Sequence, residues 1–545
     1  MCGFVCASFF NSVKNQIDFV TEINNSMDHR GGEKSHIVLH NNFILAHNRL
    51  PIVGGDIGVQ PIKNDKFCMV YNGEIYAHKN ISIYNQNVIS DTKFLFRKIN
   101  QLKSDISELQ KFMNSLDGMW SIALVENKSI YLFRDYFGQK PLYFIRLNHG
   151  FLACSDLNAV RLATKKFNNF AIEDVKEITQ GSIFKISNNF KEIINFFNSA
   201  NFSQYKTISY QKYPKNNSRI FDELLISVAK RYTSGINSKI ALSLSGGVDS
   251  SVLAIALSKV YPKKKLLFFS LASKSVAEMD IENAKKLSKI LGVKHNIINI
   301  TPKAFFLEWK KLNKLIPFGI RSPSMIAHSI LLKKVSENDI KIIFEGQGAD
   351  EFLGGYQTDR DHFKYNQINF PLIIQMFKSL SLVRLFLLIK RKIQFGNFDR
   401  RKIVDSNLFK HPLPMLLKYG DWINMYHNIE NRLIFLSPEI VNFSQNFKDI
   451  ELFNDNNSKL PLRNFLVQNG ARFIADYKVK NGYELDWHNL TLFFLQNKGL
   501  IFYFEFICKR PYSFIKFLIG IFISKKLSFL NIFSYIVDYK KSKYI

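Results

Sequence analysis

Short apolar runs separated by Gly, Asn and Asp residues dominate the chain from its first residue to about residue 203. Runs of this length and spacing predict many short β-strands, which build a layered sheet structure. The clearest runs are Phe43–Ala46, Phe67–Tyr71, Ser121–Val125, Ile130–Phe133 and Leu142–Ile145. A polar stretch that contains Pro214 and Asn216–Ser218 follows, and we predict that it links these strands to a second domain.

The pattern changes after this predicted linker, because strand-like and helix-like segments then alternate. Ala277, Ile281, Ala284, Leu287 and Leu291 fall on one helical face, and Gly292 is a typical helix end. Predicted strands occupy Lys239–Leu244, Leu266–Leu271, Lys294–Ile300 and Lys341–Phe344. This order predicts a doubly wound parallel sheet that binds its ligand at the carboxyl ends of the strands, where the loops at Ser245 and Gly346 begin.

Helical, basic and aromatic sequence follows from residue 370 onward, for example in Leu372–Lys392 and Phe514–Val537. Its uncharged runs are shorter than the roughly 20 residues that a helix needs to cross a bilayer. Two alternatives remain for these helices: they pack in a core, which the pattern favours, or they lie on a membrane surface.

Length and composition indicate how many domains the protein has, which compartment suits it and which partners its charge implies. A chain of 545 residues with 46% apolar residues predicts two or three compact domains. The five cysteines lack the paired spacing of a disulfide framework or a zinc site, which indicates a reducing, cytoplasmic environment. Met1–Phe10 lacks the basic start of a secretory signal. Lysines spread along the chain give a net charge of +29, which biased composition explains better than a nucleic-acid partner or a membrane surface.

Cys2 directly follows the initiator methionine, so removal of Met1 places a thiol beside a free α-amino group. That amine has a pKa of about 7.7–8.0 and can act as the base that activates the thiol. The alternative is a small cysteine buried near the start of a strand. Cys2 therefore predicts a nucleophile only if the sequence also contains residues that could bind a substrate beside it.

Several segments accompany Cys2 in a specific order across the first 150 residues or so. They are Asn48–Leu50, Gln60–Ile62, Tyr71–Tyr76, Asp91, Asp117–Trp120, Arg134–Asp135 and Phe137–Tyr143. Together these segments resemble the N-terminal-nucleophile glutaminase domain of glutamine-dependent amidotransferases, specifically of the asparagine synthetase type. One departure is His29–Glu33, where the family usually reads HRGPD.

The resemblance implies a role for each polar residue of this domain. Cys2 would attack the glutamine side-chain amide, and the Asn72 amide with the Gly73 backbone N–H would stabilise the oxyanion. Arg49 would bind the glutamine carboxylate through two parallel hydrogen bonds. Glu74 and Asp91 would receive its ammonium group. Each of these charges alone is more often a solvated surface group.

A second motif, Ser245–Ser250, lies between a predicted strand and the apolar run Val252–Leu257. Its consecutive small residues let backbone N–H groups face an anion, and the following helix adds its positive end. The motif lacks the Gly-Lys-Ser/Thr ending of a Walker A loop. It resembles instead the PP-loop of ATP pyrophosphatases, which split ATP between its α and β phosphates and leave an acyl-adenylate. A plain glycine turn is the alternative.

The resemblance also implies a nucleotide site. ATP would contact Ser243, Ser245, Gly246, Gly247, Asp249, Ser250, Leu271 at the adenine pocket, Gly346 and Gln347. Asp249 and Asp350 would hold Mg²⁺ on the pyrophosphate, within a second family signature at Glu345–Glu351. Lys480 would stabilise charge during adenylation, with a solvated lysine as the alternative.

Two departures from the family concern the acceptor of the nitrogen. Well-known asparagine synthetases carry Glu where Gln347 stands, and a neutral amide cannot take a proton from ammonia as a carboxylate could. Glu430–Ser437 only partly repeats the family's E-x-R-x-P-F-L-D. Arg321 lies in a stretch similar to the acceptor region and is our candidate for binding an acceptor carboxylate.

The resemblance therefore implies a four-layer αββα glutaminase domain over residues 1–205. A doubly wound α/β PP-loop domain over 206–490 and a basic helical tail over 491–545 would follow. The expected reaction is the ATP-driven amidation of aspartate with nitrogen from glutamine. Alternatives are another acceptor, such as a uronic acid, an RNA-modifying PP-loop protein, and a silent interaction protein. Self-association as a homodimer and contact of the tail with a membrane stay open, and no nucleic-acid partner is expected.

Overall fold

The computed structural model describes residues 2–477 with gaps. The gaps are 10–15, 32–34, 80, 87–89, 103–104, 148–149, 167–174, 187–191, 196–216, 273–277, 317–318, 321, 365–390, 392, 398, 411 and 455–456. Several predictions fall outside the described residues: the linker at Pro214 and Asn216, both domain boundaries, Arg321, Lys480, most of Leu372–Lys392 and the whole tail. The linker prediction was wrong for Asn217 and Ser218, which begin the helix Asn217–Tyr232.

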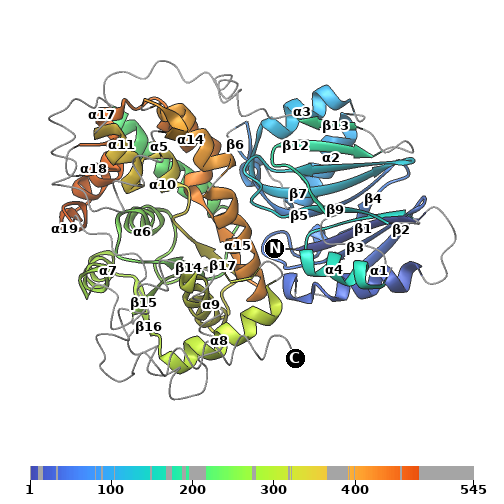
Figure 1. The fold of residues 1–545 in the computed structure, drawn as a ribbon, viewed down its shortest axis with the longest axis horizontal. Coiled ribbons are helices and arrows are strands. Elements are labelled where there is room, and N and C mark those ends of the chain that lie inside the picture. Colours follow the sequence, from blue (N-terminus) through green and yellow to red (C-terminus); the bar gives the residue numbers. More distant parts are fainter. Residues whose placement is uncertain are drawn as a thin grey trace.

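Two lobes make up the described chain, and each contains its own sheets (Figure 1). The first lobe has two antiparallel sheets. One sheet has the order β11-β9-β10-β1-β3-β2, and the other has the order β13-β12-β8-β7-β5-β4 with β6 paired to β5. The strands are β1 (Gly3–Phe9), β2 (His36–His40), β3 (Phe43–Asn48), β4 (Ile62–Lys63), β5 (Phe67–His78), β6 (Ile81–Ser82), β7 (Leu116–Glu126), β8 (Ser129–Arg134), β9 (Tyr143–Leu147), β10 (Gly150–Cys154), β11 (Lys176–Glu177), β12 (Ser182–Ile186) and β13 (Glu192–Asn195).

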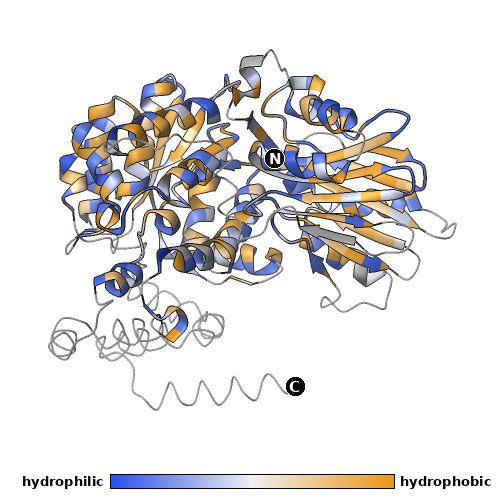
Figure 2. Ribbon diagram, turned by 90° about the horizontal axis from the view of Figure 1, so that it is seen from above, coloured by the Kyte–Doolittle hydropathy of each residue, from blue (hydrophilic) through white to orange (hydrophobic). Residues whose placement is uncertain are grey.

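The two sheets pack face to face because their strands alternate two sets of apolar residues. In β1, Phe4 and Cys6 belong to the core shared with the second sheet, whereas Val5 and Ala7 pack against helices on the outer face. The helices of this lobe are α1 (Gln16–Asn25), α2 (Asp91–Gln101), α3 (Ile106–Asn114) and α4 (Leu157–Lys166). Helices α1 and α4 cover the first sheet, and α2 and α3 cover the second. The predicted strands are confirmed, and apolar colour is concentrated along them in Figure 2.

The second lobe is built on one parallel sheet with the order β16-β15-β14-β17-β18. Its strands are β14 (Ile240–Ser243), β15 (Leu266–Ala272), β16 (Lys294–Asn299), β17 (Ile342–Phe344) and β18 (Glu430–Arg432). Its helices are α5 (Asn217–Tyr232), α6 (Val248–Val260), α7 (Glu278–Leu291), α8 (Pro302–Leu315), α9 (Pro323–Ser336), α10 (Ala349–Phe352), α11 (Gln357–Lys364), α14 (Arg400–Phe409), α15 (Leu413–Tyr426), α16 (Pro438–Ser444), α17 (Asp449–Leu452), α18 (Leu460–Gln468) and α19 (Arg472–Ala475).

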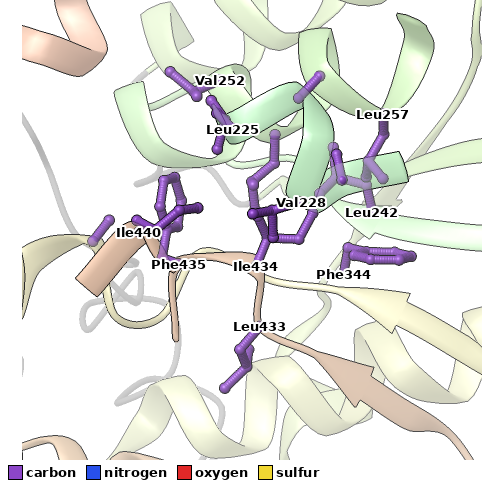
Figure 3. Close-up of a cluster of buried hydrophobic side chains, with 14 of the residues drawn as sticks. Leu225, Val228, Leu242, Val252, Leu257, Phe344, Leu433, Ile434, Phe435 and Ile440 are labelled. Atoms are coloured by element: carbon purple, nitrogen blue, oxygen red, sulfur yellow. The ribbon is translucent and has the colours of Figure 1, made fainter. Parts of the chain in front are cut away.

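Helices cover both faces of the parallel sheet, as the alternating pattern predicts. On one face Leu242 and Phe344 pack against α5 and α6 (Figure 3). On the other face Ala241 and Ile343 pack against α8, α9 and α15. The predicted helix before Gly292 is α7, and the four predicted strands are present. In the part of the chain that is described, no helix combines the length and the apolarity needed to span a bilayer.

Buried ion pairs join the two lobes where α15 lies at their boundary (Figure 1). Arg30 of the first lobe contacts Asp156 at 2.9 Å and Asp421 of α15 at 2.6 Å. Lys140 reaches the same Asp421 at 3.2 Å. Arg231 of α5 contacts Asp117 of β7 at 2.8 Å. These side chains are almost completely buried. The interface between the lobes therefore contains charged side chains that are removed from water and paired with opposite charges.

Candidate functional site

A pocket of about 370 Å³ lies beside Cys2 at the start of β1. Its lining includes Arg49 after β3, Gly73 and Glu74 in β5, and Asp91 at the start of α2. The structure thus brings together the residues that the sequence assigns to glutamine. The lining also includes Glu430 of β18, a residue of the second lobe.

Asn72 places a free hydrogen-bond donor next to Cys2. The Cys2 backbone N–H donates to Asn72 Oδ1 at 3.1 Å, which fixes the orientation of the amide. Asn72 Nδ2 is buried and has no partner among the described residues. A buried donor without a partner costs about 1–3 kcal/mol, so the group is expected to serve a ligand oxygen.

The Cys2 thiol is mostly a neutral thiol in this environment. Burial raises its pKa, while the positive amino terminus and Arg49 act in the opposite direction. The neutral thiol is a weak nucleophile, so the reaction needs a base close to the sulfur. Only 8% of Cys2 is exposed, yet the residue lines the pocket, so the buried alternative and the nucleophile are compatible.

Gly73 and Gly31 are required by close backbone contacts around the pocket. A Cβ atom on Gly73 would lie 2.0 Å from the carbonyl oxygen of Met119. A Cβ atom on Gly31 would lie 2.7 Å from the backbone of Arg49. The sequence therefore carries glycine at both positions for steric reasons, whereas the departure at Gly32 and Glu33 lies outside the described residues.

Two buried carboxylates form the acidic end of the pocket. Asp91 accepts hydrogen bonds from Tyr71 Oη at 2.8 Å and from the Thr92 backbone N–H at 2.7 Å. Glu74 accepts a hydrogen bond from Tyr84 Oη. Burial and then the charge of Asp91 raise the pKa of Glu74 well above its usual range, and burial also raises the pKa of Asp91. A bound ammonium group would relieve this repulsion.

The second lobe closes this acidic end through Arg432, which the sequence analysis did not identify. Arg432 Nε contacts Glu430 at 2.7 Å, and its Nη2 lies 3.5 Å from Glu74. The guanidinium also lies over the ring of Tyr76, 5.0 Å from its centroid. Only the partial E-x-R match marked these residues, and the motif alone did not indicate that they reach the first lobe.

The loop Ser245–Gly247 connects β14 to the N-terminus of α6 and is held by its own hydroxyls. The Ser245 backbone N–H donates to Ser250 Oγ at 3.1 Å, and the two serine hydroxyls lie 2.9 Å apart. The Gly247 N–H donates to Ser245 Oγ at 3.3 Å. This geometry places small residues at the positive end of a helix, which is suited to an anion.

Asp249 and Asp350 lie together, and both contact Lys459. Lys459 Nζ is 2.6 Å and 2.7 Å from the two carboxylate oxygens of Asp249 and also pairs with Asp350 Oδ1. Lys459 is buried and precedes α18. The sequence analysis missed it because 210 residues separate it from Asp249 and no local motif marks it. Two carboxylates beside an anion-binding loop are a donor set that suits Mg²⁺.

The remaining predicted nucleotide residues follow the same edge of the sheet. Ser243 ends β14, and Leu271 lies in β15 against the second-lobe core. A Cβ atom on Gly346 would lie 3.1 Å from that of Asp249, so the loop after β17 packs on the Ser245 loop. Gln347 follows Gly346 in that loop. Arg321 and Lys480 are outside the described residues, so their roles stay predictions.

Comparison with known proteins gives a match for each lobe. Residues 1–214 match the family model of the glutamine amidotransferase domain, and residues 220–489 match that of asparagine synthase. The chain is 24% identical over 395 residues to asparagine synthetase [glutamine-hydrolyzing] 1 of Bacillus subtilis, a match that covers 66% of this chain and 60% of the relative. It is 29% identical over 334 residues to a putative asparagine synthetase of Methanocaldococcus jannaschii, with 58% of each covered. The chain thus spans about 60% of the length of these curated relatives.

Proposed function

Because the chain belongs to the family of glutamine-hydrolysing asparagine synthetases, which are ligases, we propose that it transfers nitrogen from glutamine to an ATP-activated carboxylate. The observation that carries the proposal is the donor Asn72 Nδ2 beside Cys2, in a pocket that also contains Arg49, Glu74 and Asp91. The layered first lobe and the Ser245 loop support an N-terminal-nucleophile fold and a PP-loop, respectively. The cysteine content argued above favours the cytoplasm as the compartment.

In the first half-reaction, Cys2 Sγ attacks the side-chain amide carbon of glutamine. The free α-amino group of Cys2 takes the thiol proton, a role that the raised pKa of the thiol makes necessary. Asn72 Nδ2 and the Gly73 N–H stabilise the oxyanion, at about 3 kcal/mol for one such donor. The C–N bond breaks, the leaving nitrogen regains the proton, and ammonia departs. Water then hydrolyses the thioester to glutamate.

In the second half-reaction, a carboxylate oxygen of the acceptor attacks the α-phosphorus of ATP and pyrophosphate leaves. The Ser245–Gly247 loop and the N-terminus of α6 face the phosphates, and Lys459 exchanges its carboxylate partners for phosphate oxygens. Mg²⁺ held by Asp249 and Asp350 would neutralise phosphate charge when bound. Ammonia then forms the C–N bond, AMP leaves with the C–O electron pair, and the surplus proton passes to water.

Aspartate is our proposed acceptor, because the curated relatives are named for asparagine. A second candidate is a different acid, such as a uronic acid, which the amide of Gln347 favours by replacing the family's carboxylate. Pyrophosphate exchange into ATP, measured across a panel of carboxylic acids, separates the two. Aspartate should support exchange, whereas exchange with another acid alone would select the second candidate.

The variant Cys2→Ala tests the scheme as a whole. We expect it to lose glutamine-dependent amide formation, because the nucleophile is removed, and to keep amide formation from added ammonia at close to the wild-type rate. Glutamate, amide and AMP release measure the two halves separately. Survival of both activities, or amide formation without AMP, would refute the proposal.

A further inference from the structure

Gln347 presents an unusual buried acceptor at the nucleotide edge of the parallel sheet. Its Oε1 atom is shielded from solvent and has no hydrogen-bond partner among the described residues. The neighbouring Gly346 packs against Asp249, so Gln347 lies beside the Ser245 loop. An amide oxygen without a partner is costly to bury, which indicates that it accepts a hydrogen from a ligand.

Glu345, two residues earlier, fixes the direction of this amide. The Gln347 amide N–H donates to the Glu345 carboxylate, so Gln347 Oε1 must face away from it. Glu345 is held in turn by His328 of α9, whose Nε2 lies 2.6 Å from Oε1. Asn431 Nδ2 of β18 donates to Oε2 of the same carboxylate at 2.8 Å. Two elements, α9 and β18, thus hold Glu345 in place.

Glu345 and His328 of this cluster each favour the charged form of the other. The partner His328 keeps the pKa of Glu345 below its usual value although burial opposes this, and the carboxylate in turn raises the pKa of His328. When His328 is protonated, its charge offsets that of Glu345 behind Gln347, and the amide itself presents a dipole without net charge. Such an acceptor suits a neutral N–H donor, whereas a carboxylate at position 347 would also attract ammonium.

We propose that Gln347 Oε1 binds the ammonia that attacks the adenylate, and that Glu345 is the positioning residue that orients Gln347 for this purpose. The inference rests on the proposed function, because it needs both an adenylate and ammonia. It gives this chain a way to hold the nucleophile with a neutral amide. The negative charge that the family places at position 347 lies here two residues earlier in the sequence.

The variant Gln347→Leu tests the binding role in the full-length enzyme with ammonium salts as the nitrogen source. We expect the KM for ammonia to rise about tenfold, the upper range for one hydrogen bond. Glutamine hydrolysis, which takes place in the first lobe, should stay at the wild-type rate. Because the resemblance also places Gln347 near ATP, the KM for ATP in pyrophosphate exchange is measured in the same variant, and we expect it to change by a smaller factor than the KM for ammonia. Gln445→Leu, the same change on an exposed glutamine at the end of α16, should alter none of these values.

The variant Glu345→Gln tests the positioning role. A glutamine at position 345 can donate as well as accept a hydrogen bond, so the Gln347 side-chain amide can then rotate and exchange the places of its oxygen and nitrogen. We expect the KM for ammonia to rise about threefold with pyrophosphate exchange retained, and Glu345→Asp to raise it less. An unchanged KM for ammonia in Gln347→Leu would overturn the proposal. So would a parallel loss of pyrophosphate exchange in both variants. Absence of exchange in the wild-type enzyme with every acid would overturn the proposed function itself.

Discussion

Gly246 shows how a single residue can be dictated by the packing of two segments. Its φ of +78° lies in the left-handed region, and a Cβ atom would lie 1.9 Å from the carbonyl oxygen of Asp280. The sequence reveals the glycine but not the partner, because Asp280 belongs to α7, which is separate from the motif. Glycine is therefore needed here for steric reasons as well as for its backbone freedom.

The variant Gly246→Ala should lose ATP-dependent pyrophosphate exchange by at least tenfold. The methyl group must move the loop or α7, in addition to about 1–2 kcal/mol of backbone strain. Gly292→Ala is the matched control: its φ is +66°, but no atom lies within 4 Å of the added Cβ. The control should lose about 1 kcal/mol of unfolding free energy and keep exchange. Wild-type exchange in Gly246→Ala would contradict the steric argument.

The grouping of candidate residues is predictable where a local motif carries them. Cys2, Asn72 and Asp249 stand in short segments whose order identifies them, and the structure brings each to a site. Lys459 and Arg432 could not be found in this way. Each acts across a large sequence separation, and in a chain with 74 Lys and Arg residues neither stands out. Contacts of this kind depend on the packing of the lobes, which one sequence does not specify.

At the scale of elements, β18 is the segment that the hydrophobic pattern missed. The strands β14, β15 and β17 are apolar runs, and the predicted ends of β14–β17 lie within one residue of the observed ends. In contrast, β18 consists of Glu430, Asn431 and Arg432, which have no apolar alternation. It joins the sheet by backbone pairing with β17. Its side chains are buried and form ion pairs or hydrogen bonds with charged partners.

Replacing Arg432 by Met tests the buried pairing made by β18. The change should lower the free energy of unfolding by about 3–5 kcal/mol, because Glu430 and Glu74 lose a buried cationic partner. The KM for glutamine should also rise, since Glu74 lines the pocket. Urea unfolding and glutaminase kinetics measure the two effects.

Arg219→Met provides the control for this experiment. Arg219 pairs with Glu223 at 3.1 Å on the exposed face of α5, where both side chains are mostly solvated. An exposed pair contributes about 0–1 kcal/mol, so this variant should unfold almost like the wild type. Equal stability losses in the two variants would mean that burial of Arg432 does not matter.

At the scale of the whole molecule, the lobes depend on charges that are ionised at neutral pH. Although burial opposes it, Arg30 and Lys140 hold the pKa of Asp421 below its usual value. A carboxyl with a lowered folded pKa stabilises the protein fully above its unfolded pKa of about 3.9, and this contribution is lost as the pH falls. The interface should therefore weaken in acid.

The variant Asp421→Asn tests this dependence, with Asp18→Asn on the exposed surface of α1 as the control. We expect Asp421→Asn to be less stable than the wild type at neutral pH. The difference should shrink as the pH falls below about 4, because the wild-type carboxyl then becomes neutral too. Urea unfolding across this range measures it. A difference that stays constant with pH would exclude ionisation as its source.

The three residues of β18 have a consequence for any attempt to redesign the enzyme. Glu430 and Arg432 point toward the pocket beside Cys2, while Asn431 holds Glu345 in the loop that packs on the Ser245 loop. Under the proposed function, a library that randomises this strand would perturb nitrogen release and nitrogen capture together, so improved clones would be rare. Directed evolution toward a new acid should keep these three positions constant and diversify positions that touch only one of the two centres.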